Sequence, residues 1–182
     1  MAKKGDIWIS AVIYIGLGVI AITLLVAAGV PLINKMRDRN TFLQTKEVMQ
    51  VIDKAIMEVV SEGPGSRRFL SPLEIKQGKL NIPLSPRKIV WEMETRAIVQ
   101  EPGVSVYEGN LNITVSKHSF IKDLYVTEIA LDYFYDDGIL IGVDGDFEAG
   151  KIEDLRGKFG LSISNEGINP SPPLIKVNID VV

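Results

Sequence analysis

One stretch of the chain, from Ile7 to Ile33, runs for 27 residues without a charged side chain. A helix needs about 20 apolar residues to cross the hydrocarbon core of a bilayer, so this stretch is long enough to span it. A cleaved secretory signal has an apolar core of only about 7–15 residues, although Ala27-Ala28-Gly29 could imitate its small-residue cleavage site. The stretch therefore predicts a retained transmembrane helix in a lipid bilayer, with a cleaved signal as the alternative.

The residues that follow continue a helical pattern, but with two distinct faces. After a polar collar at 34–40, apolar residues recur at spacings of three and four: Phe42, Val48, Ile52, Ala55 or Ile56, and Val59. This spacing is typical of an amphipathic helix. Gly63-Pro64-Gly65 predicts its end, because glycine and proline favour helix termination. We therefore expect a membrane helix at 6–33 and an amphipathic extension at 34–62.

Gly29 and Pro31 form the one weak point expected in this helix. Pro31 has no N–H to donate to the carbonyl oxygen of Ala27, and its ring crowds that carbonyl, so a kink is expected here. The alternative is that the span ends at this point and the amphipathic helix is a separate element. Charge does not set the orientation, because lysines and arginines flank the stretch on both sides.

Residues 67–182 change to a period of two, which indicates β-strands. About eight short runs alternate with turn signals, and we expect a turn at Gln77-Gly78 and a hairpin closed by residues 108–110. This spacing predicts an antiparallel β-sandwich-like domain. The expected fold class is therefore α+β, with a long N-terminal helix followed by this domain.

Composition excludes several kinds of chemistry. The chain has no cysteine and a single histidine, His118, which rules out thiolate and multi-histidine metal sites. The net charge of −3 argues against a nucleic-acid partner. No glycine-rich phosphate loop is present outside the apolar stretch, and His118 lacks an accompanying base, so we expect neither a cofactor nor an enzyme.

Two local motifs remain as candidate sites. Asp144, Asp146 and Glu148 occupy positions one, three and five of a Ca²⁺-type loop, but Ala149 and Leu155 stand where such loops carry Gly and Glu. We therefore expect a solvated acidic loop and treat these three only as weak calcium candidates. Asn112 begins an N-glycosylation triplet with Ile113 and Thr114, which has meaning only if the domain lies outside the cell.

The start of the chain resembles the prepilin-type (class III) signal of archaeal type IV pilins and archaellins. Lys4, Gly5 and Asp6 lie directly before the apolar stretch, as the charged residue, the Gly and the first mature residue do in that family. The extended helix with an apolar and an amphipathic half, followed by a β-rich head, fits the same family. Bacterial pilins usually have Glu at the fifth mature position, where this chain has Ser10, and archaeal members often lack that Glu.

The resemblance implies a structural role. A prepilin peptidase would remove the leader 1–5 after Gly5 and leave the apolar helix on the mature subunit. The precursor would rest in the cell membrane with its C-terminal domain outside. Copies of this chain or other pilins would then assemble into a cell-surface filament that serves adhesion. The alternative is a non-polymerising β-sandwich domain on a single-pass anchor that binds a surface partner.

Overall fold

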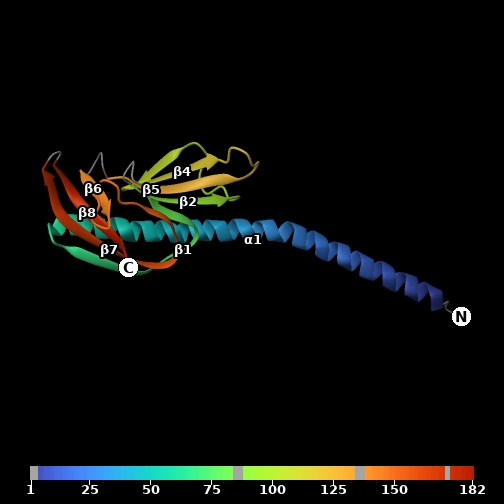
Figure 1. Cartoon of the computed structure of the whole chain (residues 1–182). Coiled ribbons are helices and arrows are strands. Elements are labelled where there is room, and N and C mark those ends of the chain that lie inside the picture. Colours follow the sequence, from blue (N-terminus) through green and yellow to red (C-terminus); the bar gives the residue numbers. More distant parts are fainter. Residues whose placement is uncertain (1–3, 84–87, 134–137, 171–172) are drawn as a thin grey trace. The chain divides into compact units, whose positions relative to one another are not determined.

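The structure is a computed structural model that describes residues 4–83, 88–133, 138–170 and 173–182. It contains two compact units, Met1–Arg37 and Asp38–Val182. Helix α1, Lys4–Glu62, contributes to both, and the second unit contains all of the strands (Figure 1). The expected α+β class, with a long apolar N-terminal helix, is confirmed.

Helix α1 ends where the glycines predicted its end. Gly63 has a φ of +92°, a left-handed conformation that suits glycine and breaks the helical path. The carbonyl oxygen of Val59, which can no longer find a helical partner, accepts a hydrogen bond from Ser66 Oγ at 2.7 Å and another from Asn165 Nδ2 at 3.0 Å. These bonds satisfy the carbonyl oxygen of Val59 and tie the end of the helix to the sheet.

Eight strands form one hydrogen-bonded sheet in the order β3-β4-β5-β2-β1-β7-β8-β6. All neighbours are antiparallel except β6 and β8, which are parallel, so the sheet is mixed. The predicted hairpin is present, because β3 pairs with β4 through Glu108 and Leu111. The strands are β1 Arg67–Ile82, β2 Ile89–Thr95, β3 Ser105–Glu108, β4 Leu111–Lys117, β5 Tyr125–Leu131, β6 Ile139–Val143, β7 Ile152–Pro170 and β8 Pro173–Val181.

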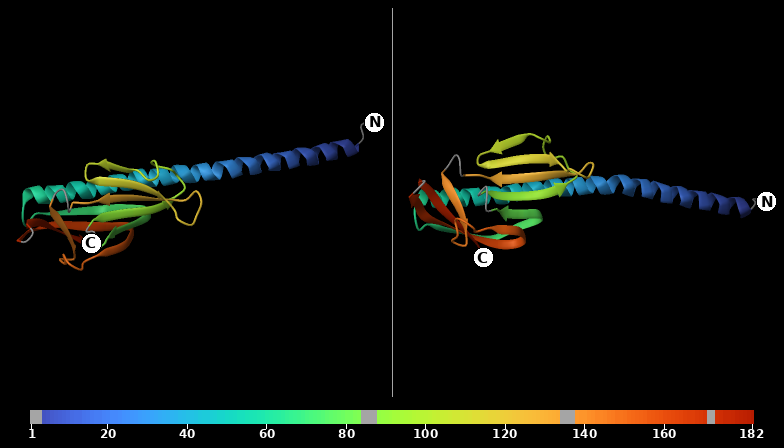
Figure 2. Two further views of the ribbon diagram at one scale, coloured as in Figure 1. Left: turned by 90° about the horizontal axis from the view of Figure 1, so that it is seen from above. Right: turned by 45° about the horizontal axis from the view of Figure 1, so that its top comes forward.

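The sheet differs from the expected sandwich in what covers its inner face. It curves around residues 38–62 of α1, so that the helix forms the opposing layer (Figure 2). An alternation of apolar and polar residues indicates that one face of a strand is buried, but it does not reveal whether a helix or a second sheet buries that face. The long pair β1 and β7 bends through irregularities in register, which lets a single sheet wrap around the helix.

Gly78 lies in one of these irregularities rather than in the expected turn. Strand β1 continues through it, with a register shift between Ile75 and Leu80. Gly78 has a φ of +79°, and a Cβ atom there would lie 2.7 Å from Trp91 Nε1. The Trp91 indole is buried and donates from Nε1 to the carbonyl oxygen of Gln77 at 3.0 Å. The glycine therefore makes room for a core tryptophan within a bulge.

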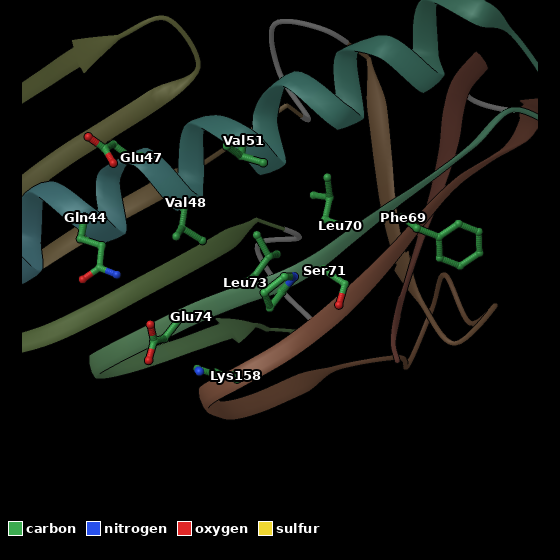
Figure 3. Close-up of a pocket in the computed structure, with 11 residues that line it drawn as sticks. Gln44, Glu47, Val48, Val51, Phe69, Leu70, Ser71, Leu73, Glu74 and Lys158 are labelled. Atoms are coloured by element: carbon green, nitrogen blue, oxygen red, sulfur yellow. The ribbon is translucent and has the colours of Figure 1, made fainter.

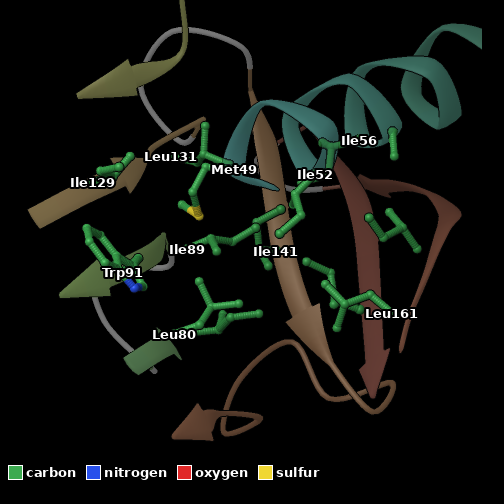
Figure 4. Close-up of a cluster of buried hydrophobic side chains, with 14 of the residues drawn as sticks. Met49, Ile52, Ile56, Leu80, Ile89, Trp91, Ile129, Leu131, Ile141 and Leu161 are labelled. Atoms are coloured by element: carbon green, nitrogen blue, oxygen red, sulfur yellow. The ribbon is translucent and has the colours of Figure 1, made fainter. Parts of the chain in front are cut away.

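The core lies between α1 and the concave face of the sheet. Met49, Ile52 and Ile56 of α1 point toward side chains from β1, β2, β5, β6 and β7 (Figure 4). The predicted amphipathic stripe is confirmed at Phe42, Ile52, Ala55, Ile56 and Val59, all of which are buried. Met49 is fully buried where the sequence favoured its neighbour Val48, which is only half-buried.

Polar contacts align this part of α1 with the strands. Asp38 Oδ2 accepts a hydrogen bond from Thr95 Oγ1 at 2.7 Å, at the end of β2. Fifteen residues along the helix, Asp53 Oδ1 accepts from Asn110 Nδ2 at 2.9 Å and from the hydroxyl of Tyr133 at 2.7 Å. Between these points Lys46 Nζ lies 2.5 Å from Glu108 Oε2. The helix therefore runs alongside β2, β4 and β5, with Asp38 at one end of these strands and Asp53 near the other.

Candidate functional site

The largest unusual surface in the described part of the chain is the apolar half of α1. Every residue from Trp8 to Ala28 is exposed, and none of the most apolar window, whose mean hydropathy is 2.6, is buried within the structure. A helical segment of this length and apolar character can cross a membrane, and it is compatible with a single-pass anchor. Its exposed large side chains include Trp8, Val12, Tyr14, Leu17, Ile20, Leu24, Leu25, Leu32 and Ile33.

The few polar side chains on this surface suit an apolar environment. Thr23 Oγ1 donates a hydrogen bond to the carbonyl oxygen of Val19 at 2.8 Å, so the hydroxyl group is satisfied within the helix. The glycines at 16 and 18 have no described atom near their would-be Cβ positions, which leaves room for another helix to approach closely. The surface can therefore contact lipid or other helices without leaving this hydroxyl donor unpaired.

The predicted processing and kink residues all lie in α1. Lys4, Gly5 and Asp6 form its first turn, directly before the apolar surface. Gly29 and Pro31 lie inside the helix, which continues through Pro31 without a break, so the alternative of two separate helices does not apply. The carbonyl oxygen of Ala27 still lacks the hydrogen bond that an ordinary residue at 31 would give it. The kink itself stays a prediction, as does cleavage after Gly5.

Asn112 lies in β4 on the face opposite the core. Its neighbours Leu111 and Ile113 are buried, whereas Asn112 and Thr114 are half-buried and share the other face. Asn112 Nδ2 lies 3.4 Å from the hydroxyl oxygen of Tyr107 in the adjacent strand β3, and its Oδ1 is buried without a hydrogen-bond partner among the described residues. The glycan at Asn112 stays a prediction, and it would have to displace the contact with Tyr107.

The acidic loop is organised by backbone contacts rather than by converging carboxylates. Asp146 Oδ1 accepts hydrogen bonds from the N–H groups of Glu148 and Ala149, each at 2.8 Å, and Val143 pairs with Asp146 through the backbone. Asp144 adopts a left-handed φ of +51°, and it is exposed. Within the residues that the structure describes, no group of three or more acidic or histidine side chains could hold a metal ion. Asp146 thus acts as a local turn-forming residue.

His118 also organises a loop. Its Nδ1 accepts hydrogen bonds from the N–H of Phe120 at 3.2 Å and from that of Ile121 at 3.3 Å. Its Nε2 lies 3.8 Å from Glu94 Oε1, and its ring meets the edge of Phe120 at a centroid distance of 6.2 Å. These contacts give His118 a structural role that no sequence motif signals.

A shallow groove of about 650 Å³ lies between α1 and β1 in the second unit. Val48 and Val51 of the helix face Leu70 and Leu73 of β1 across it (Figure 3). Glu47, Glu74 and Lys158 are the charged residues at its margin. Its lining is mainly apolar and contains no nucleophile paired with a base among the described residues, so the groove offers a packing surface rather than a reaction centre.

The strongest charge cluster near the end of α1 is structural. Arg68 Nε donates to Glu58 Oε2 at 3.1 Å, and its Nη2 pairs with Glu62 Oε1. The hydrogen bond to Glu58 and the contacts with Glu62 raise the pKa of the Arg68 guanidinium. Because an arginine is already charged at any ordinary pH, this cluster fastens the helix end to β1 without titrating.

Comparisons with protein-family models, with curated proteins and with solved structures find no match for this chain.

Proposed function

We propose that this chain is a structural subunit of an archaeal type IV pilus-like filament at the cell surface. The observation that carries the proposal is the uncharged apolar surface of residues 8–33, exposed at every residue but the half-buried Gly29, on a helix whose following half belongs to a folded β domain. The helix would hold subunits together, and the β domain would be displayed outside for adhesion or surface attachment.

An exposed apolar surface of this size is unfavourable in water unless lipid or protein covers it. A helix of 26 residues is about 39 Å long and about 10 Å wide, so its side wall amounts to on the order of 1,000 Å². Soluble monomers rarely expose contiguous apolar patches larger than a few hundred Å². Lipid tails can cover the helix before assembly, and helices of other subunits can cover it afterwards.

Helix-to-helix packing explains how a filament would form. Gly16, Gly18 and Ala21 would allow neighbouring helices to approach closely, which favours association in an apolar environment. Contacts between two different faces of identical subunits do not close on themselves and therefore generate a helical filament. The exchange of lipid contacts for helix contacts would let the subunit leave the bilayer.

The residues before the apolar surface carry the processing signal of this proposal. Lys4-Gly5-Asp6 matches the prepilin-type signal, so a prepilin peptidase would cut after Gly5 and expose Asp6 as the new N-terminus. The cut lies before the apolar surface, which stays on the mature subunit. This order distinguishes the signal from a secretory leader, whose apolar core is removed.

The test combines N-terminal mass analysis with electron microscopy of native cells. We expect a mature chain that begins at Asp6 and filaments that contain it. Gly5→Leu should block processing and leave the subunit in the membrane, whereas the matched variant Gly5→Ala, with its small side chain, should still be processed. An unprocessed native chain without filaments would favour the alternative, a membrane-anchored β domain that binds a surface partner and does not polymerise.

A further inference from the structure

The sheet has two outer strands, β3 and β6, and their free edges differ. Strand β6 is buried at every residue. At its free edge the N–H of Ile139 donates to the carbonyl oxygen of Tyr133 at 3.3 Å, and Val143 and Asp146 exchange two backbone hydrogen bonds at 2.9 and 3.0 Å. Strand β3 is exposed at every residue, so one edge of the sheet is covered by its own chain and the other is open.

The hairpin fixes which backbone groups of β3 point away from β4. Glu108 and Leu111 flank a turn of two residues and form a pair, which in such a hairpin exchanges two backbone hydrogen bonds. Hydrogen-bonded and non-hydrogen-bonded pairs alternate along an antiparallel ladder, so Val106 also bonds to β4. The N–H and C=O groups of Ser105 and Tyr107 therefore point outward, and no described residue bonds to them.

Strand β3 has few of the features that prevent edge strands from pairing. Natural edges are blunted by lysine, proline, bulges, short length or a covering segment. Residues 105–108 include no lysine or proline, and they pair with β4 without a register shift, so short length is their main protection. The one charged residue, Glu108, is already paired with Lys46 of its own domain.

The open edge is complementary to itself. Two antiparallel copies of β3 can bring Ser105 of each copy opposite Tyr107 of the other, with the two Val106 residues facing each other at the centre. Both outward-pointing residues of each copy then belong to hydrogen-bonded pairs. This register satisfies every outward N–H and C=O group of Ser105 and Tyr107 in both copies.

Neighbouring registers use less of the edge. A shift by two residues in either direction places one outward-pointing residue of each copy opposite position 103 or 109. Gly103 already donates its N–H to the carbonyl oxygen of Val115 at 2.8 Å, and Gly109 lies in the turn. In the register centred on residue 106, Glu108 lies opposite Val104, so no like charges face each other across the contact.

We propose that the β3 edge binds a second copy of this chain by antiparallel β3–β3 pairing centred on Val106. The occupant is an extended segment, because the groups left open are those of a strand backbone, and a second copy satisfies all of them in one register. The contact is isologous and small, so it forms a weak dimer rather than a permanent one. It involves only residues 104–108, so it does not depend on filament assembly and the two proposals fail separately.

The absence of cysteine from the sequence allows a direct test by disulfide cross-linking. Directly opposed residues of a non-hydrogen-bonded pair have Cα atoms about 4.5 Å apart, which a disulfide can span. The full chain in detergent carries the single substitution Val106→Cys and is mildly oxidised. Val181→Cys is the matched control, because Val181 is also an exposed strand valine but lies in β8.

We expect several-fold more disulfide-linked dimer at position 106 than at position 181, with a yield that increases with protein concentration. Tyr107→Cys should give less dimer than Val106→Cys, because position 107 lies opposite position 105 of the second copy. Equal yields at 106 and 181, or the highest yield at 107, overturn the proposed pairing.

A second pair of variants tests whether the backbone makes the contact. Ser105→Pro removes an N–H that points outward, a position at which edge strands tolerate proline. Added to Val106→Cys, it should lower the dimer yield several-fold and leave the urea midpoint unchanged, whereas Ser105→Ala keeps the N–H and should retain the dimer. An undiminished yield in the proline variant overturns the proposal. A lowered midpoint would show that this N–H belongs to the β3–β4 pairing, which overturns it as well.

Discussion

The two halves of helix α1 have the same backbone conformation but opposite surroundings. From Trp8 to Arg37 nearly every side chain is exposed, whereas from Asp38 to Glu62 one face is buried against the sheet. The first half is apolar on all sides as far as Ile33, and the second half alternates buried and polar positions at helical spacing. Both halves have the same helical backbone hydrogen bonds. The distribution of apolar side chains therefore decides whether a part of the helix packs against the protein core or can contact lipid.

The buried face of the second half also shows how a helix is held in a curved sheet. Thr41, Thr45, Met49, Ile52, Ile56 and Val59 follow each other at spacings of three and four and are all buried. Polar contacts at Asp38, Lys46 and Asp53 lie along the same length of helix. Substitutions in the two halves should therefore affect different properties of the protein.

The largest effect is expected from a charge in the buried half. Ile52 is fully buried in the core, and Ile52→Asp would place a carboxylate without a partner among apolar side chains. Such burial is strongly unfavourable, so we expect the β domain to lose about 4 kcal/mol or more of its free energy of unfolding. Urea unfolding of the full chain in detergent measures this loss; a near-normal midpoint would contradict the packing of α1 against the sheet.

The same type of substitution in the exposed half should act on membrane insertion instead. Leu24 is 66% exposed, so Leu24→Asp removes no contact from the β domain. Replacement of leucine by aspartate near the centre of a membrane helix costs about 3–4 kcal/mol of insertion free energy. We expect a larger soluble fraction on carbonate extraction of membranes and an unchanged urea midpoint. A lowered midpoint would show that this half supports the domain.

A smaller effect is expected from the polar contact that joins α1 to the turn between β3 and β4 and to the segment after β5. Asp53→Ala removes the acceptor of the Asn110 and Tyr133 hydrogen bonds and should lower the free energy of unfolding by about 1–3 kcal/mol. Asp53→Asn keeps an oxygen acceptor and serves as the control, so it should lose less. Thermal unfolding distinguishes them, and equal losses would mean that charge rather than hydrogen bonding matters here.

The smallest effect is expected from the ion pair between Lys46 and Glu108. Both side chains are partly exposed, so the pair should contribute no more than about 1 kcal/mol, and high salt should weaken it further. A double-mutant cycle with Lys46→Ala and Glu108→Ala measures the coupling. A coupling well above this value, insensitive to salt, would show that the pair is a major tie between helix and sheet.

The parts of the fold that could be predicted were those encoded by local patterns. The helix stripe at Ile52, Ile56 and Val59, the stop at Gly63 and the hairpin at Glu108 and Leu111 each follow from residues close in sequence. The sequence predicts a turn at Gly78, because glycine readily adopts the positive φ that turns and bulges both require. Only the position of Trp91, thirteen residues further along the chain, reveals the bulge.

The site was predictable to the same extent. The apolar surface of α1 follows from composition alone, since a helix without charge or alternation has no face that can remain in water. The hydrogen bonds that His118 Nδ1 accepts from the N–H groups of Phe120 and Ile121 could not be found in this way, because no sequence motif signals them.

The sequence by itself determined that this chain has a long apolar helix, an amphipathic continuation and a β-rich domain, because hydrophobic periodicity is a local property. The tertiary structure decided that the strands form one mixed sheet, that β6 and β8 run parallel, and that the sheet wraps around residues 38–62 of α1. These choices depend on which buried faces meet, and that depends on contacts between residues distant in the chain, whose pairing no local pattern records.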